Sequence, residues 1–126
     1  MRRALEWCDW GCHRNVLLVG RYALKTPVMN GALRWWVRGW LVNLDEAEQW
    51  RSTQDPGLCP VLFSFFGLVN VQPRCDEAGD VREYEVTRAR AAFEARRGHE
   101  CTAEPFAKSY GRLDGRVVAF DYGRVA

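Results

Sequence analysis

Polar and apolar residues follow a strand-like pattern in the first part of the chain. Residues 15–26, which read NVLLVGRYALKT, are rich in Val, Leu and Tyr, and this composition predicts strand structure. Gly20 lies in the middle of the segment and predicts either a tight turn or a bulge. The alternation after Gly20 places Ala23 and Lys25 on the same face of the strand. Residues 1–10, which precede this segment, predict a short helix or an edge strand.

The spacing of large apolar residues changes to a helical period over residues 32–51. Apolar side chains recur there at intervals of three and four residues, which predicts an α-helix with one buried stripe. The residues of this stripe are Leu33, Trp36, Trp40, Leu44 and Ala47. A neighbouring stripe consists of Trp35, Gly39, Asn43, Glu46 and Trp50. Because apolar groups cover much of the helix circumference, we expect the helix to be heavily buried, with Asn30 as its N-cap.

The remaining elements are predicted from local composition and turn residues. They are a loop over residues 52–60, a hairpin of residues 61–66 and 68–72 around Gly67, a helix over residues 81–97 that ends near Gly98, an irregular stretch over residues 101–111, and a last strand over residues 117–120. The first half of the second helix also fits an alternating strand. The predicted fold class is α+β, with a small antiparallel sheet packed against two main helices.

Length and composition indicate a folded domain. The chain has 126 residues, of which 48% are apolar, and this predicts one compact domain over residues 1–126 in which residues 1–14 are an N-terminal extension. The formal net charge of +2 is too small to drive non-specific binding to nucleic acid. Because no apolar run has the length of a membrane span and no secretory signal is visible, we expect a cytoplasmic protein with reduced thiols and no membrane partner.

The five cysteines do not follow the pattern of a metal site. Cys8, Cys12 and His13 form a C-x3-C-H sequence. The other candidate ligands are Cys75, His99 and Cys101. Structural zinc sites usually use four ligands in similarly spaced pairs, which these residues do not form. We therefore expect ordinary thiols rather than a zinc site or a cysteine nucleophile.

Four landmarks, taken in order along the chain, resemble parts of the protein-kinase fold. Residues 23–25, Ala-Leu-Lys, resemble the Ala-x-Lys of the third kinase strand, and Glu46 lies on the helix that follows. Residues 61–74 resemble the hairpin that leads into the hinge between the kinase lobes. Residues 117–123, VVAFDYG, resemble the strand that ends in Asp-Phe-Gly, with Tyr in the middle position. The chain is also similar to small kinase-like proteins of bacterial phages and mobile elements.

The resemblance implies roles for three of these residues in binding ATP and Mg²⁺. Lys25 would hold the α- and β-phosphates, Glu46 would fix Lys25, and Asp121 would bind the metal ion. Each residue also has a simpler interpretation. Lys25 would be a strand residue with its ammonium group in solvent, Glu46 part of a solvated helix face, and Asp121 a turn residue.

Two further candidates follow from the same resemblance. The catalytic aspartate of the kinase pattern would fall at Glu104, and the second metal ligand, an Asn in kinases, would fall at Ser109. The candidate catalytic residues are therefore Lys25, Glu46, Glu104 and Asp121. The candidate residues for binding the nucleotide and the metal are Lys25, Ser109 and Asp121.

The chain departs from the kinase pattern at several points. The segment before Asn15 contains only Gly11 where kinases have a Gly-rich loop, and no His-Arg-Asp sequence is present. Phe106 stands where kinases place a lysine. Because three residues follow Gly123, we expect neither an activation segment nor a helical lobe for substrate binding. An active protein kinase is therefore not the expected function.

Three hypotheses about function remain. The first is a non-catalytic, kinase-like binding module that docks on a host or partner protein, such as a phage inhibitor of a host system. Its contact residues would be Trp35, Arg38 and Trp50, since Trp and Arg are common in binding hot spots, although Trp residues also fill the cores of small domains. The second is a nucleotide-binding or weakly active small kinase. The third is a nucleic-acid-associated regulator that uses Arg and Trp.

Overall fold

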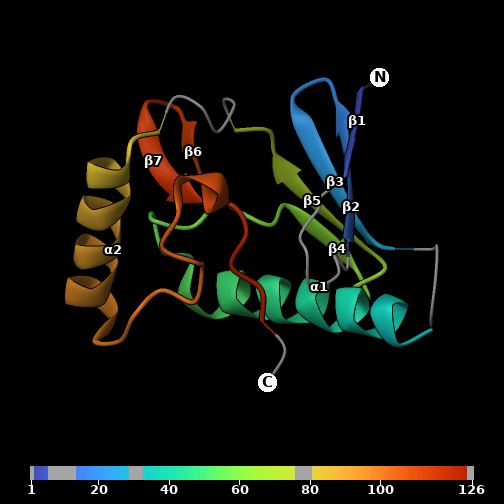
Figure 1. Cartoon of the computed structure of the whole chain (residues 1–126). Coiled ribbons are helices and arrows are strands. Elements are labelled where there is room, and N and C mark those ends of the chain that lie inside the picture. Colours follow the sequence, from blue (N-terminus) through green and yellow to red (C-terminus); the bar gives the residue numbers. More distant parts are fainter. Residues whose placement is uncertain (1, 6–13, 29–32, 76–80, 125–126) are drawn as a thin grey trace.

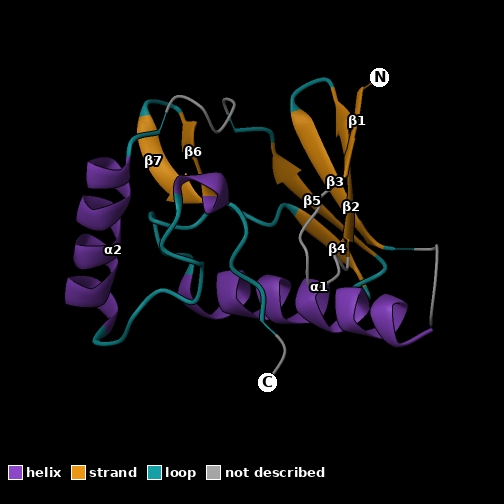
Figure 2. Ribbon diagram, in the orientation of Figure 1, coloured by secondary structure: helices purple, strands orange, loops and turns teal. Residues whose placement is uncertain are grey.

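Two antiparallel sheets and two α-helices form the part of the protein that the structure describes, residues 2–5, 14–28, 33–75 and 81–124 (Figure 1). In the computed structural model, helix α1 runs along the five-stranded sheet, and helix α2 lies beside the two-stranded sheet (Figure 2). The predicted α+β class with a small antiparallel sheet is confirmed. Helix α1 packs against the five-stranded sheet, and helix α2 packs against the two-stranded sheet.

The five-stranded sheet has the order β1-β2-β3-β5-β4, and all neighbouring strands are antiparallel. The strands in this order are β1 (Arg2–Leu5), β2 (Arg14–Val19), β3 (Tyr22–Pro27), β5 (Val69–Pro73) and β4 (Phe63–Phe65). The predicted segment 15–26 forms two strands, because the chain reverses at Gly20, which has a φ of +57°. Gly20 therefore marks a tight turn rather than a bulge. The predicted edge strand is present as β1, while residues 6–13 lie outside the described ranges.

The hairpin predicted around Gly67 is confirmed by β4 and β5. Phe66 and Gly67 form its tip with φ values of +53° and +79°. A Cβ atom at Gly67 would lie 2.7 Å from Cγ of Leu44, so glycine allows the tip to approach α1 closely. The indole N–H of Trp40 donates a hydrogen bond of 2.7 Å to the Phe66 carbonyl oxygen. These contacts attach the hairpin tip to Trp40 and Leu44 of α1.

Helix α1 (Leu33–Thr53) forms where the sequence predicts a helix, but the predicted buried stripe was wrong. Leu33 is 75% exposed, and the other residues of that stripe, Trp36, Trp40, Leu44 and Ala47, are half-buried. The buried residues are Gly39, Val42, Asn43 and Glu46. The reason is that β3 and β5 direct polar side chains toward the helix, and buried polar groups need polar partners. The expected N-cap, Asn30, lies outside the described residues.

Helix α2 (Glu83–Arg97) also forms where predicted, so the alternative strand is excluded. The helix ends at Gly98, which has a φ of +78° and donates its N–H to the Glu94 carbonyl oxygen. Neither α1 nor α2, the α-helices of the described residues, combines the length and the apolar character that crossing a membrane requires.

The apolar core lies between α2 and the hairpin of β6 (Tyr110–Leu113) and β7 (Arg116–Ala119). Its buried residues are Leu58, Val81, Val86, Phe93, Cys101, Ala103, Tyr110, Ala119 and Tyr122. Strand β6 was not predicted, since its sequence Tyr-Gly-Arg-Leu has no strand pattern of its own. It pairs with β7 across a turn at Asp114 and Gly115. Tertiary pairing therefore decides its structure.

The segment that follows α1 connects the two sheets. Leu58 forms a parallel bridge with Ala119, the last residue of β7. The N–H of Cys59 donates to the Ala119 carbonyl oxygen at 2.7 Å, and the N–H of Ala119 donates to the Gly57 carbonyl oxygen at 2.8 Å. This pairing fixes the end of β7 close to the end of α1.

Asp55, in the same segment, holds α2 in place. Its buried carboxylate accepts hydrogen bonds from Arg96 at 2.7 and 3.1 Å, from Arg97 at 2.8 Å, and from the N–H of Gly57 at 2.8 Å. Burial alone would raise the pKa of Asp55, but the hydrogen bonds from both arginines outweigh it and lower the pKa to about 2. The carboxylate is therefore ionised at neutral pH and binds both guanidinium groups.

We expect the Asp55→Asn substitution to destabilise the protein by about 2 kcal/mol, because charge-assisted hydrogen bonds to two arginines are lost. Urea unfolding at neutral pH measures this change. Glu94→Gln is the matched control, since Glu94 is an exposed carboxylate on α2, the helix that Asp55 binds. Equal unfolding midpoints for Asp55→Asn and the control would contradict the proposed role of Asp55.

Candidate functional site

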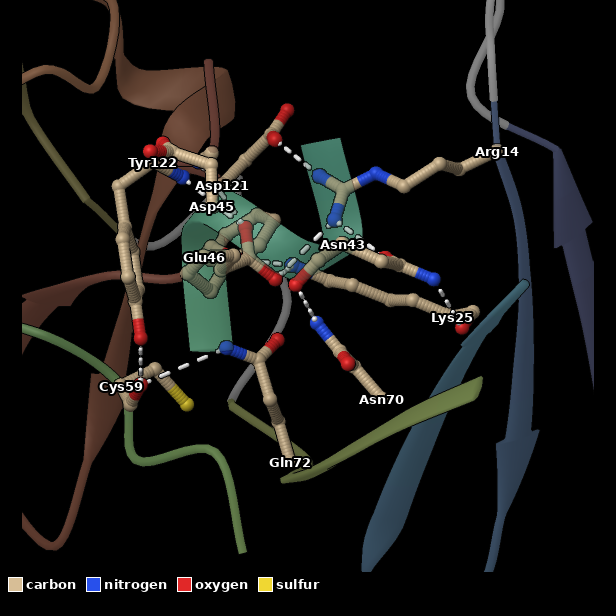
Figure 3. A network of polar contacts seen from close by, with 12 residues as sticks. Arg14, Lys25, Asn43, Asp45, Glu46, Cys59, Asn70, Gln72, Asp121 and Tyr122 are labelled. Carbon is tan, nitrogen blue, oxygen red and sulfur yellow. Dashed lines mark hydrogen bonds and ion pairs between the residues drawn. The ribbon is translucent and has the colours of Figure 1, made fainter. Parts of the chain in front are cut away.

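Three of the residues predicted from the kinase resemblance come together at one place. Lys25 projects from β3, Glu46 projects from α1, and Asp121 follows β7, and their side chains converge between the sheet and the helix (Figure 3). Arg14, at the start of β2, lies among them. The cluster thus joins the β2–β3 hairpin, α1 and the segment after β7, which are far apart in the sequence.

Lys25 is buried and its ammonium group does not lie in solvent. Its side chain is 2% exposed, and Nζ lies 3.0 Å from Oε1 of Glu46. The ammonium group also donates to the carbonyl oxygen of Phe120 and lies 5.8 Å from the centre of the Phe120 ring. Lys25 therefore binds both α1 and the segment that follows β7.

Glu46 accepts four hydrogen bonds within the cluster. Its Oε1 accepts hydrogen bonds from Lys25 and from Arg14, both at 3.0 Å. Its Oε2 accepts the backbone N–H groups of Tyr122 and Gly123, both at 3.2 Å. Burial alone would raise the pKa of Glu46, but the charges and hydrogen bonds of Arg14 and Lys25 lower the pKa to about 2. Glu46 is therefore a buried, ionised carboxylate rather than part of a solvated helix face.

Arg14 is the member of the cluster that the sequence did not single out. Its side chain is 2% exposed and donates to Oδ1 of Asn43 at 3.1 Å, to Oε1 of Glu46 and to Oδ1 of Asp121. The signal that could have found it is strand alternation. Val16 pairs with Lys25, so Arg14, two residues before Val16, lies on the same face as Lys25.

Asp121 does not have the surroundings that a magnesium ion needs. Its side chain is 35% exposed, but one carboxylate oxygen pairs with the guanidinium group of Arg14. Mg²⁺ requires several oxygen ligands in an octahedral arrangement. Over residues 14–28, 33–75 and 81–124, no group of three His, Cys, Asp or Glu side chains could hold a metal ion. The residues present therefore do not fit the metal that the resemblance implies.

Two asparagines extend the polar network between the sheet and α1. The side-chain amide of Asn43 donates to the carbonyl oxygens of Lys25 at 3.0 Å and Gly67 at 2.9 Å. Asn70 donates to the Asn43 carbonyl oxygen at 2.8 Å and accepts from the hydroxyl of Ser64 at 2.6 Å. Polar side chains thus replace the apolar packing that a sheet and a helix normally use. Sequence reasoning missed both residues, because single asparagines give no local signal.

The segment after Asp121 is held against α1 by its backbone. Tyr122 is buried, and its hydroxyl donates to the Cys59 carbonyl oxygen at 2.8 Å. Burial, as the main cause, raises the pKa of Tyr122 far above its ordinary value, so the phenol is neutral. A methyl group at Gly123 would overlap the Val42 carbonyl oxygen of α1. Tyr and Gly at these positions are therefore explained by packing and by close approach to the helix.

The structure does not bring Glu104 into the cluster. Glu104 is exposed, and its carboxylate lies 3.5 Å from Nζ of Lys108. Ser109, by contrast, is buried at the end of a short 3₁₀ helix, Ala107–Ser109, and its carbonyl oxygen accepts the N–H of Phe120 at 3.0 Å. Phe106, which stands in the place of the kinase lysine, is 51% exposed.

The three expected contact residues have different surroundings. Arg38 is exposed on α1. Trp35 is half-buried, with the guanidinium group of Arg34 4.7 Å from its ring centre. Trp50 is partly buried and packs against the apolar core. The three side chains therefore differ in how much of their surface is open to a partner.

Several arginines that a nucleic acid would need are used inside the fold. Arg96 and Arg97 bind Asp55, and Arg112 binds Glu85 at 2.6 Å. Such pairing leaves fewer cations to neutralise phosphates. Of the cysteines that the structure describes, Cys59 and Cys101 are buried thiols, and Sγ of Cys75 lies 3.7 Å from Sγ of Cys59. Cys8, Cys12 and His13 lie outside the described residues.

Comparisons of the chain with protein-family models, with curated proteins and with solved structures found no match. The function must therefore be inferred from the site itself.

We expect the Glu46→Gln substitution to destabilise the protein by about 3–5 kcal/mol, because two buried cations lose their shared carboxylate. The native pKa of about 2 lies below the ordinary value of 4.5, so ionised Glu46 contributes fully above pH 4.5. This contribution is lost as the pH falls from 4.5 toward 2. The test compares the unfolding free energies of the natural sequence and of Glu46→Gln across this pH range.

The unfolding free energy of Glu46→Gln should fall less with decreasing pH over this range than that of the natural sequence. Some dependence will remain, since the lowered pKa of Asp55 acts in the same direction. Glu48→Gln is the control, because Glu48 is 56% exposed on the same helix. An unchanged pH dependence in Glu46→Gln would show that the buried cluster does not stabilise the fold in this way.

Proposed function

We propose that the chain is a kinase-like binding module without phosphoryl-transfer activity and that it acts by binding another protein. The observation that carries this proposal is the position of Arg14. Its guanidinium group lies between Glu46 and Asp121, and its side chain is 2% exposed. Under the kinase resemblance, metal and phosphates would lie beside these two carboxylates, and in this chain the guanidinium group of Arg14 pairs with both of them.

The arrangement of Lys25 supports the same proposal. A lysine that holds phosphates must present its ammonium group to the ligand. Here the ammonium group donates to Glu46 and to the Phe120 carbonyl oxygen, and the side chain is 2% exposed. Glu104, the position expected for the catalytic base, is exposed and pairs with Lys108. Lys25 and Glu46 thus hold α1, β3 and the segment after β7 in fixed relative positions.

A rigid scaffold of this kind suits recognition of a macromolecule. Buried, fully paired polar networks hold backbone segments in one arrangement, and a preorganised surface loses little conformational entropy on binding. The partner class that the resemblance implies is a protein of a host cell. The paired arginines favour a protein partner over a nucleic acid.

The test is the thermal stability of the full chain with and without ATP and Mg²⁺. A ligand at 100 times its Kd stabilises the native state by roughly 2.7 kcal/mol, so nucleotide binding at about millimolar affinity is detectable with excess ATP. We expect no change in Tm for the natural sequence, because Arg14 and Lys25 are already bound within the fold.

Asp121→Asn and Asp45→Asn are the paired variants for this experiment. Asp45 lies on α1, where it accepts hydrogen bonds from Gln49 and from the N–H of Arg124. A rise in Tm that persists in Asp45→Asn and disappears in Asp121→Asn would contradict the proposal. Such a result would favour the alternative, a nucleotide-binding protein that uses Lys25, Glu46 and Asp121.

A further inference from the structure

The two faces of the five-stranded sheet differ in the polarity of their side chains. The face toward α1 carries Arg14, Lys25, Asn70 and Gln72, all of which are buried. Successive strand residues point to opposite faces, so their neighbours point away from α1. The register aligns Leu17, Leu24, Val71 and Phe63 as one apolar row across four strands on this outer face. The outer face is therefore largely apolar, whereas the face toward α1 combines buried charged and amide side chains with apolar residues such as Ala23.

The outer face ends in three phenylalanines at the edge strand. Phe63 and Phe65 have ring centres 6.5 Å apart, and the rings of Phe65 and Phe66 meet edge to face at 5.0 Å. Phe63, Phe65 and Phe66 are 56%, 48% and 74% exposed. At the other side of the face, Val19 pairs with Tyr22, and these side chains are 37% and 43% exposed. An exposed apolar surface with several aromatic rings is typical of an interaction site.

The backbone of Phe66 adopts a conformation that is unfavourable for a residue other than glycine. Its φ of +53° lies in the left-handed region, which bulky residues rarely adopt and which glycine adopts readily. The side chain does not compensate for this by burial, since it is 74% exposed. A strained and exposed aromatic residue is more easily understood as a binding contact than as a stabilising residue.

Charge indicates what kind of surface covers this face. Strands β2 to β5 carry two charged side chains, Arg14 and Lys25, and both point toward α1. On β1, Arg3 pairs with Leu17 and so borders the apolar row on the side away from the phenylalanines. Around the phenylalanines, a charged partner surface would lose its hydration without gaining a counter-charge. An identical apolar face avoids that loss, and a net charge of +2 gives little repulsion between two copies.

The exposed aromatic area supplies a substantial part of what a dimer interface requires. Since a buried aromatic side chain contributes roughly 150–250 Å², the exposed fractions of the three phenylalanines leave about 350 Å² open. Tyr22, Val19 and the apolar row extend this area toward the roughly 800 Å² that each partner contributes to a standard interface.

We propose that the outer face of the five-stranded sheet, with Phe63, Phe65 and Phe66 at its edge, is the interface of a symmetric homodimer. Two copies would pack sheet against sheet, as in a β-sandwich, and each would cover the apolar row of the other. This proposal does not depend on the kinase resemblance. The ATP experiment can fail without affecting it.

Sedimentation equilibrium of the full chain over about 1–100 μM tests the proposal, and we expect a dimer within this range. Phe63→Thr should raise the dimer Kd by roughly tenfold or more, because it removes a large apolar contact from each subunit. Phe106→Thr is the matched control. Phe106 is 51% exposed and lies outside the sheet, so this variant should dimerise like the natural sequence.

Phe66→Gly separates the proposal from simple misfolding. Glycine adopts the positive φ without strain, so the variant monomer should unfold at a higher urea concentration than the natural monomer, while its dimer Kd rises. A chain that stays monomeric at about 100 μM would overturn the proposal. It would also be overturned by a dimer whose Kd is unchanged in Phe63→Thr and Phe66→Gly. A monomer that binds a different protein through these phenylalanines would assign the same face to another partner and reject the homodimer.

Discussion

The buried carboxylate of Glu46 connects the parts of this protein that matter most. It binds a lysine from β3, an arginine from β2 and two backbone N–H groups from the segment after β7. Burial of charged groups carries a large desolvation cost, which only complete pairing offsets. Glu46 meets this condition because all four donors reach its two oxygens. The relative positions of sheet, helix and C-terminal segment are therefore coupled through one side chain.

This coupling changes where the apolar residues lie. The space between the five-stranded sheet and α1 contains buried charged and amide side chains, and many large apolar residues of the sheet lie on the opposite face. The described apolar core lies instead around α2 and the β6–β7 hairpin, where Phe93 and Tyr110 are buried. The buried polar network and the apolar core therefore lie in two different regions of the fold.

The sequence predicted most elements because their signals are local. The helical period of α1, the glycine that ends α2 and the hairpin at Gly67 each depend on neighbouring residues. It did not predict β6, which requires its partner strand, or the buried stripe of α1. Lys25, Glu46 and Asp121 were proposed as a set, and the structure brings them together. Arg14 was missed because its position follows from strand register, which one sequence does not reveal.

The attachment of Tyr122 and Gly123 to Glu46 has a consequence for how the chain acquires its structure. These backbone bonds span 76 and 77 residues, so they are among the least local contacts of the fold. During synthesis, α1 and the first strands leave the ribosome long before their last partners. Until then the Glu46 carboxylate lacks two of its donors, and the Lys25 ammonium group lacks the Phe120 carbonyl oxygen. High contact order of this kind slows folding, and here it delays completion of the charged centre until the segment after β7 has been synthesised.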